Sequence, residues 1–252
     1  MSKSKIAIVT GGSRGIGRNT VLSLARRGVR SIFTYNTNRA EADKVVALAA
    51  DAGAQAIALQ LDTGNTGAFA GFAEAVRQAL ATLDAERFDH LVNNAGTSSS
   101  AGLLTITEAE MDALYAVHFK GVLFLTQTLL PLMNDGGRIV NISSGLARAA
   151  MPGRIGYGPI KAGVEALTRY MALELGPRRI TANIVAPGAI ATDFSGGVVR
   201  DNPGVNKAVA DHTALGRAGV PEDVGPVIAA LLSDDFGWVN AQRIEVAGGM
   251  HI

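Results

Sequence analysis

The 252 residues include no cysteine. This absence excludes disulfides, thiolate metal sites and a cysteine nucleophile, and it favours a cytoplasmic protein. The histidines do not replace cysteines as metal ligands, because His90, His212 and His251 show no metal-ligand spacing. We therefore predict no metal site.

The sequence also lacks an excess of charge and a long hydrophobic run. Its net charge of +1 gives no field that would attract nucleic acid or an anionic membrane surface. No stretch reaches the ~20 uninterrupted apolar residues of a membrane helix. The apolar run at 6–9 ends in glycines and is too short for a signal peptide. We expect no nucleic-acid partner and no membrane contact.

Aromatic residues make up only 5%, but hydrophobic residues make up 48%, enough for a large buried sheet. Short apolar runs predict strands at 6–10, 31–35, 56–60, 90–93, 138–142, 181–185 and 242–246. Between them, helical periodicity covers 17–27, 39–52, 67–80, 108–132, 157–175 and 221–232. Apolar strands that alternate with helices predict one α/β domain over 1–252: a doubly wound Rossmann-type domain with a mostly parallel seven-stranded sheet and helices on both faces.

The stretch at 192–217 has no regular period, because Gly, Asp, Asn and Pro interrupt it. A long loop within a compact domain is typically a lid or a binding loop. We predict that it covers the substrate.

A glycine-rich turn follows the first predicted strand. Gly11 can turn sharply, Gly15 lets the backbone approach a pyrophosphate, and Gly17 permits close packing of helix and strand. The helix start would offer free N–H groups to phosphate oxygens. The turn reads Thr10-Gly11-Gly12-Ser13-Arg14-Gly15-Ile16-Gly17, so it predicts dinucleotide contacts from Gly11, Ser13, Arg14, Gly15, Ile16 and Gly17.

This Thr-Gly-x-x-x-Gly-x-Gly spacing resembles that of the short-chain dehydrogenase/reductase family, and further motifs in the family's order extend the resemblance over nearly the whole chain. They are Asn93-Asn94-Ala95-Gly96, Ser144, Tyr157-Gly158-Pro159-Ile160-Lys161, Pro187-Gly188-Ala189-Ile190-Ala191-Thr192 and Glu245-Val246-Ala247-Gly248-Gly249-Met250. The resemblance implies cofactor contacts from Asn94, Ala95, Gly96, Tyr157, Lys161, Pro187, Gly188, Ile190 and Thr192. Asp62 and Thr63 resemble the family's adenine-contacting pair; the alternative is an ordinary turn at a strand end.

The end of the second strand bears on the choice between NADP and NAD. An acidic residue there would bind the ribose diol and repel a 2′-phosphate. Here Asn36 stands at that place, and no carboxylate occurs before Glu41. Arg14 and Arg39 could donate charge-assisted hydrogen bonds to a phosphate, although Arg39 could equally be a solvated residue at a helix start. The pattern predicts NADP(H).

Three residues carry the predicted chemistry. At four-residue spacing, Tyr157 and Lys161 share one helix face. A tyrosine ordinarily titrates near ~10, and an ammonium beside it is expected to lower that pKa toward the working range of an acid/base. Ser144 would hydrogen-bond the substrate carbonyl oxygen and stabilise its developing charge.

His118 marks a departure from the family. The resemblance implies an asparagine there that positions a water connecting the lysine to solvent. Histidine could also hold a water, and it would titrate near ~6.5. We count His118 as a catalytic candidate; the alternative is a histidine that fills space.

The leading hypothesis is an NADPH-dependent reductase of a small ketone, which also oxidises the corresponding alcohol. The mostly apolar walls expected at 97–102, 145–156 and 192–212 favour an uncharged or aromatic ketone, unless Arg148 and Arg154 face inward. A 3-oxoacyl-[acyl-carrier-protein] reductase, which the chain also resembles, is the alternative. The resemblance implies that such enzymes dock an acidic carrier on basic residues, partly in the loop before the fifth strand, where this chain has Asp135; Arg178 and Arg179 remain possible contacts. A dinucleotide-sensing regulator is a third reading. The resemblance also implies a homo-oligomer, a tetramer or a dimer.

Overall fold

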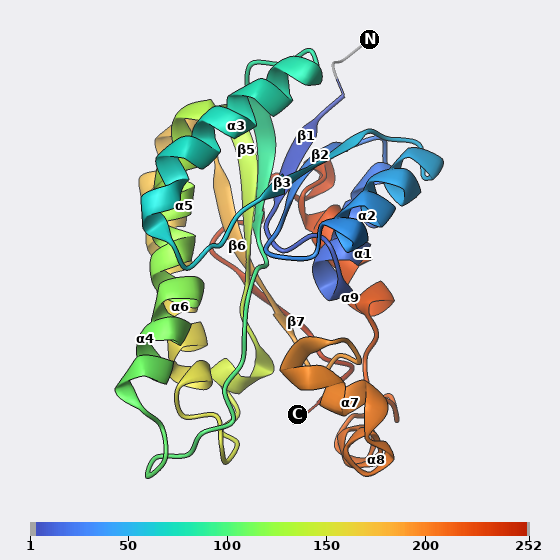
Figure 1. Cartoon of the computed structure of the whole chain (residues 1–252), viewed down its shortest axis with the longest axis vertical. Helices are drawn as coiled ribbons and strands as arrows, with labels where there is room; N and C mark the ends of the chain where they lie inside the picture. Colours follow the sequence, from blue (N-terminus) through green and yellow to red (C-terminus); the bar gives the residue numbers. More distant parts are fainter. Residues whose placement is uncertain (1–3, 251–252) are drawn as a thin grey trace.

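The computed structural model describes residues 4–250, so His251 lies outside the described part. Seven parallel strands form one sheet in the order β3-β2-β1-β4-β5-β6-β7 (Figure 1). Their bounds are β1 Ile6–Val9, β2 Arg30–Tyr35, β3 Ala56–Gln60, β4 Phe88–Asn93, β5 Met133–Ile142, β6 Thr181–Pro187 and β7 Arg243–Val246. The predicted Rossmann-type fold class is confirmed, and every strand is parallel to its neighbours.

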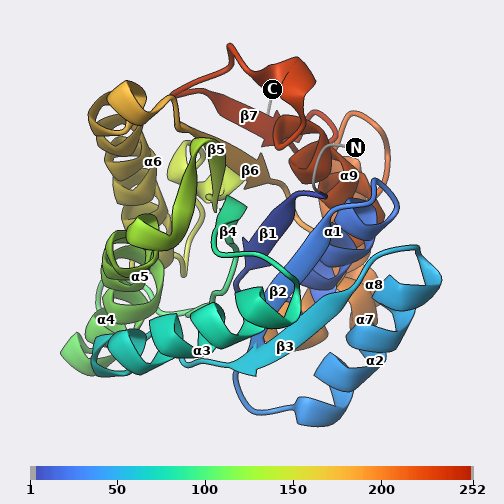
Figure 2. The same cartoon turned by 90° about the horizontal axis from the view of Figure 1, so that it is seen from above.

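Helices cover both faces of the sheet (Figure 2). One layer consists of α1 Gly15–Ala25, α2 Arg39–Asp51 and α9 Pro221–Leu231; the other consists of α3 Phe69–Thr82, α5 Gly121–Leu129 and α6 Tyr157–Glu174. Each layer forms its own apolar core against the sheet. All four residues of β1 are buried, which explains why its apolar run does not alternate with polar residues.

The fifth strand begins earlier than predicted. β5 starts at Met133 instead of Arg138, so residues 134–137 extend the strand where we expected a loop. The pairing of β4 with β5 shifts register between Phe88 and His90. This irregularity accommodates residues 134–137, whose Asn, Asp and Gly content gives no strand signal.

The helix predicted over 108–132 is broken into segments. α4 (Glu108–Tyr115) begins with a capping box between Thr107 and Glu110, and a π-helical turn at Ala116–Lys120 joins it to α5. A short 3₁₀ turn, Leu130–Leu132, completes the run. By length and hydropathy, Glu108–Leu132 is the one run in the described part that could span a membrane. It packs one face on the sheet core through Val122, Leu125 and Leu129.

The segment at 192–217 is not the continuous loop that we predicted. It contains two short helices, α7 (Val198–Asp201) and α8 (Pro203–Asp211). The Asn202 side chain accepts hydrogen bonds from two N–H groups at the start of α8, and Pro203 is the first residue of that helix. This cap and proline are a helix-start signal that the irregular composition obscured.

The topology determines where a ligand can bind. The strand order reverses between β1 and β4, and in such sheets ligands bind beyond the carboxyl ends of the strands at this point. Both helices of the 192–217 segment lie at that end, near the bottom of Figure 1. The turns after β1, β4, β5 and β6 converge there.

Candidate active site

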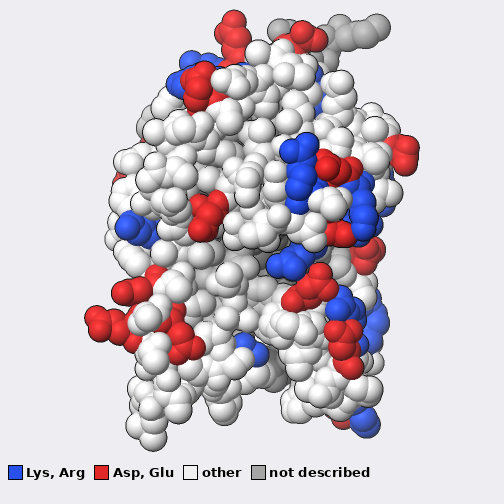
Figure 3. Space-filling view, in the orientation of Figure 1, with Lys and Arg blue, Asp and Glu red and all other residues white. Residues whose placement is uncertain are grey.

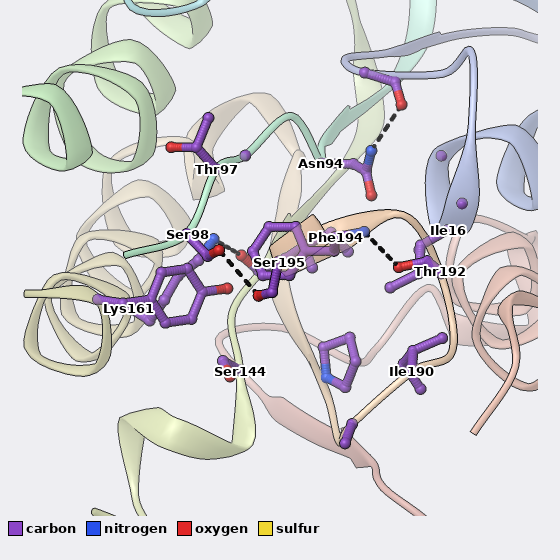
Figure 4. Close-up of a pocket in the computed structure, with 18 of the residues that line it drawn as sticks. Ile16, Asn94, Thr97, Ser98, Ser144, Lys161, Ile190, Thr192, Phe194 and Ser195 are labelled. Atoms are coloured by element: carbon purple, nitrogen blue, oxygen red, sulfur yellow. Dashed lines mark hydrogen bonds between the residues drawn. The ribbon is translucent and has the colours of Figure 1, made fainter. Parts of the chain in front are cut away.

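A cavity of about 1140 Å³ opens at the carboxyl ends of the strands. The space-filling view shows the molecule hollowed between two lobes at its lower end (Figure 3). Figure 4 shows Lys161 and Ser144 on one side of the pocket and Ile16, Ile190 and Thr192 on the other. The cavity therefore joins the predicted cofactor residues to the predicted catalytic ones.

The turn after β1 has the close backbone approach that its glycines predict. Gly11 and Gly15 have φ values of +65° and +56°, in the left-handed region that residues with a side chain rarely adopt. A Cβ on Gly17 would lie 2.2 Å from the Gly11 carbonyl oxygen. α1 begins at Gly15, so its free N–H groups face the cavity that this turn lines. These residues fit the pyrophosphate of a dinucleotide.

Asn94 holds this turn against the sheet. Its side-chain amide donates to the carbonyl oxygens of Thr10 and Gly11, at 2.9 and 3.1 Å. The Thr10 hydroxyl in turn accepts from the backbone N–H groups of Asn94 and Ala95. The contacts found for Asn94 are thus structural, although it also lines the cavity.

The remaining cofactor residues lie on the cavity wall with one exception. Those that line it are Gly11, Ser13, Arg14, Gly15, Ile16, Gly17, Asn36, Asp62, Thr63, Asn94, Ala95, Gly96, Tyr157, Lys161, Pro187, Gly188, Ile190 and Thr192. Arg39 does not. It pairs with Asp43 at 2.8 Å and lies over the Tyr35 ring, because its helical position directs it along the exposed face of α2.

The wall near Asn36 also includes an acidic residue. Glu41 lines the cavity and pairs with Lys44 at 2.6 Å. Arg14, in the glycine turn, is exposed and lines the same cavity. Of the two arginines predicted to contact a 2′-phosphate, the structure brings only Arg14 to the cavity.

The three predicted catalytic residues meet at one wall. Ser144 follows β5, while Tyr157 and Lys161 come from the first turns of α6. The Ser144 hydroxyl is near enough to the Tyr157 hydroxyl to lower the pKa of Tyr157, and Lys161 Nζ lies 5.6 Å from the Tyr157 ring centroid. Lys161 Nζ also donates to the Ile142 carbonyl oxygen at 2.8 Å, which fixes the ammonium below the tyrosine ring.

Burial governs the ionisation of this pair. It raises the pKa of Tyr157 well above its usual value, and the nearby Ser144 hydroxyl and the charge of Arg154 only partly offset it. Burial also lowers the pKa of Lys161 to about 7. Our expectation that the ammonium would lower the pKa of Tyr157 was wrong, because desolvation of the phenolate dominates. The phenol keeps its proton, as a proton donor requires.

Comparison with known proteins gives a family for this geometry. A family model described as "Enoyl-(Acyl carrier protein) reductase" matches residues 11–251. Versicolorin reductase 1 of Aspergillus parasiticus is 35% identical, over 97% of this chain and 95% of its own. A short-chain dehydrogenase/reductase from Serratia marcescens has a TM-score of 0.90 at 33% identity, over 98% of both chains. The chain belongs to the short-chain dehydrogenase/reductase family.

A third similar protein is informative about ligands. The angucycline C-6 ketoreductase LanV, whose structure has bound NADP, gives a TM-score of 0.92 at 33% identity, over 97% of this chain and 95% of its own. The match covers nearly the whole chain, and so includes the glycine turn and the wall of predicted catalytic residues. The nicotinamide cofactor class and an oxidoreductase function follow from family membership.

His118, the departure from the family pattern, lies in the π-helical turn of the long helix. Its Nε2 is 2.7 Å from the Thr97 carbonyl oxygen and 3.2 Å from the Thr97 backbone nitrogen, and its Nδ1 is buried without a hydrogen-bond partner among the described residues. The ring meets Tyr157 edge-on at 5.2 Å. Burial and the charge of Lys161 lower the pKa of His118 to about 3, well below the value near 6.5 that we expected. No hydrogen bond joins it to Lys161 within residues 4–250, and its relay role stays a prediction.

A hydrogen-bonded cluster behind Ser144 was missed by the sequence analysis. Glu165 accepts hydrogen bonds from Ser143 Oγ and Arg243 Nε, both at 2.7 Å. Arg243 also donates to the Ser144 carbonyl oxygen at 3.3 Å. The one signal was spacing, since Glu165 lies four residues beyond Lys161 on the same helix. The cluster connects β7 and α6 to Ser144, the predicted catalytic serine.

The substrate half of the cavity is mainly apolar, as predicted. Its walls include Leu146, Ala149, Met151, Phe194, Val198, Val199, Val205 and Val209, whereas Ala150 and Ile155 do not line it. The Phe194 ring lies 6.0 Å from that of Tyr157. Ser195 hydrogen-bonds Ser98 at 2.9 Å (Figure 4), which connects the 192–217 segment to the turn after β4. Arg148 and Arg154 both line the cavity as well.

Within the described residues, no group of three or more acidic, histidine or cysteine side chains could hold a metal ion. His90 is buried in β4, where desolvation lowers its pKa to about 4. The donors that line the cavity include a phenol, several hydroxyls, an ammonium and guanidinium groups. Such a set can donate protons and bind anions, and it fits acid-assisted hydride transfer.

Proposed function

We propose that this chain is an NADPH-dependent carbonyl reductase that acts on free ketones and, in reverse, oxidises the corresponding secondary alcohols. The observation that carries the proposal is the common wall of Ser144, Tyr157 and Lys161 in the cavity that the glycine turn also lines. One continuous cavity can hold a dinucleotide at one end and a ketone against the tyrosine at the other.

Each residue of this wall has a distinct task. When bound, NADPH supplies a hydride to the carbonyl carbon and becomes NADP⁺. Tyr157 gives its phenolic proton to the carbonyl oxygen, so the product is a neutral alcohol. Ser144 donates a hydrogen bond to the same oxygen as negative charge develops there. Lys161, held by the Ile142 carbonyl, places a positive charge under the phenolate that remains.

The preference for NADPH rests on charge at the far end of the cavity. Arg14 is exposed there, and Asn36 stands where a carboxylate would repel a 2′-phosphate. The NADP bound to the related ketoreductase LanV supports the same choice. Glu41 opposes it, but this carboxylate is paired with Lys44.

The apolar substrate half favours an aromatic ketone. The similar proteins include versicolorin reductase 1 and the hydroxynaphthalene reductase-like protein Arp2 of Metarhizium brunneum, both 35% identical, and the second is named for an aromatic naphthalene compound. Phe194 offers an aromatic face beside Tyr157 against which a planar substrate can pack.

A 3-oxoacyl-[acyl-carrier-protein] reductase is the second candidate, since the family model's description names an acyl-carrier-protein enzyme. An acidic carrier would need free basic residues on its docking surface, and the sequence offered Arg178 and Arg179 as candidates. Arg178 is instead paired with Asp135 at 2.7 Å and donates to two backbone carbonyl oxygens. This pairing favours the free ketone.

We also propose a homo-oligomer, a tetramer or a dimer. Exposed aromatic and leucine side chains on α4, α5 and α6 support it: Tyr115, Phe124, Tyr170 and Leu173. Light scattering of the purified protein tests the proposal, and a monomer at micromolar concentration would contradict it.

The function is tested by following NADPH oxidation with a set of aromatic ketones, aliphatic ketones, quinones and 3-oxoacyl thioesters. Turnover of free ketones that is lost in Tyr157→Phe is the expected result. Preference for a carrier-bound thioester over its small analogue would select the second candidate. NADPH binding without turnover of any carbonyl or alcohol would favour a dinucleotide-sensing regulator.

A further inference from the structure

Arg154 lies beside the proton donor and faces the substrate half of the cavity. It precedes Tyr157 by three residues, and its carbonyl oxygen accepts from the Tyr157 and Gly158 N–H groups, so both side chains start from the same helical turn. Its Nη1 donates to the Ser99 carbonyl oxygen at 2.8 Å. This bond holds the guanidinium between the catalytic tyrosine and the turn after β4.

The charge of Arg154 is not neutralised by a carboxylate. Its hydrogen bond goes to a backbone carbonyl, and it forms no ion pair within the described part of the chain. By contrast, Arg148 is largely exposed and pairs with Glu245 at 3.3 Å. Arg154 is therefore the guanidinium in the substrate half that retains a full charge for a ligand.

The acidic residues of the cavity wall are already engaged elsewhere. Asp193 pairs with Arg200, and Glu245 pairs with Arg243 at 2.7 Å. At the dinucleotide end, Glu41 pairs with Lys44, and Asp62 accepts from the Gly64 N–H group. These bonds leave no acidic residue of the wall to meet Arg154. Figure 3 shows basic surface inside the hollow between the lower lobes.

We propose that the physiological substrate is a ketone that carries an anionic oxygen group, such as a carboxylate, and that Arg154 binds this group while the carbonyl faces Tyr157 and Ser144. The inference deepens the proposed function and rests on it. It also replaces the uncharged ketone that the apolar walls alone favoured with one that carries a negative charge, because Arg154 lines the cavity.

The geometry suits this role in two ways. A guanidinium has five N–H donors in a planar fork, and the bond to Ser99 uses one nitrogen, which leaves donors for a carboxylate. The positive charge of Arg154 also acts on the Tyr157 hydroxyl, because it partly offsets the rise in the pKa of Tyr157 that burial causes. The anionic group would thus lie within a few bonds of the carbonyl, against apolar walls that strengthen the attraction.

Binding can be measured without turnover. The probes are 4-phenylbutanoate and its neutral analogue 4-phenylbutanamide, titrated by calorimetry into the protein saturated with NADP⁺. For the wild type we expect the carboxylate to bind about ten- to a hundredfold more tightly than the amide, as for a charged hydrogen bond. In Arg154→Gln, which keeps an N–H donor for Ser99, that preference should disappear.

Arg148→Gln is the matched control. It removes a positive charge from the same cavity wall, but this charge is already neutralised by Glu245. It should keep the preference for the carboxylate. Equal binding of the two probes by the wild type would overturn the proposal. So would a preference that survives in Arg154→Gln.

Turnover then separates this inference from the proposed function. With 4-oxo-4-phenylbutanoate and its methyl ester as substrates, Arg154→Gln should raise KM for the acid about tenfold or more and change kcat/KM for the ester far less. Equal losses on both substrates would mean that Arg154 only supports the wall, and would refute the inference. Carboxylate binding without reduction of either ketone would instead refute the proposed function.

Discussion

Replacing Gly17 with alanine should disturb the dinucleotide site more than any other single methyl group. The new Cβ would lie 2.2 Å from the Gly11 carbonyl oxygen and 2.5 Å from Asn94 Nδ2. Ordinary contacts begin near 3.4 Å, so helix and turn would have to separate by about 1 Å, as in overpacked cores. Both atoms belong to rigid parts of the site, because Asn94 holds the turn by two hydrogen bonds.

The magnitude follows from two opposing effects. Overpacking costs up to about 3 kcal/mol, whereas exchanging glycine for alanine within a helix returns about 0.5–1 kcal/mol. We expect Gly17→Ala to lower the free energy of unfolding by about 2 kcal/mol, or Tm by about 4–8 °C for a chain of this size. NADPH affinity should fall as well, since the N–H groups of α1 move relative to the turn.

Gly71→Ala is the matched control. It lies in α3, is exposed, and a Cβ there would meet nothing within 4 Å. It should raise Tm by about 1–4 °C through helix propensity alone and leave NADPH affinity unchanged. Thermal unfolding and NADPH fluorescence titration measure both variants. Wild-type stability and affinity in Gly17→Ala would refute the argument from close approach.

Four further predictions concern the chemistry. Tyr157→Phe should lower kcat by about 10²–10⁴-fold with NADPH binding retained; a loss under about tenfold would point to another proton donor. Asn36→Asp should shift the ratio of kcat/KM toward NADH by repelling a 2′-phosphate, and a wild-type preference for NADH would contradict the assignment. With its pKa near 3, His118 should add no inflection to the pH dependence of kcat around pH 6.5. If His118 serves a proton relay, His118→Asn should be tolerated and His118→Leu should slow turnover. A leucine variant as fast as wild type would show that His118 only fills space. Burial lowers the pKa of Lys161 from 10.5 to about 7, so between these pH values the unfolded chain binds a proton that the folded chain does not. The free energy of unfolding of wild type relative to Lys161→Met should therefore rise from pH 7 to 10. A difference that stays constant with pH in urea unfolding would show that the ammonium is not desolvated.

The sequence determined the layers of the fold because a parallel sheet buries both faces of its strands. Apolar runs such as Ile6–Val9 can only be central strands when helices separate them, and right-handed crossovers then leave few topologies. The glycine turn was equally predictable, since positive φ at Gly11 and close approach at Gly17 exclude side chains. Short-range spacing likewise placed Tyr157 and Lys161 on one helix face.

The tertiary structure decided how segments far apart in the chain meet. Local pattern could not show that Arg39 pairs along its own helix while Arg14 reaches the cavity, or that Glu165 and Arg243 meet behind Ser144. Nor could it give the sign of the pKa shift at Tyr157, because burial depends on every segment packed around the hydroxyl. The isolated charge of Arg154 is of the same kind: it depends on which partners the other charged residues of the cavity take, and only the assembled fold brings those partners together.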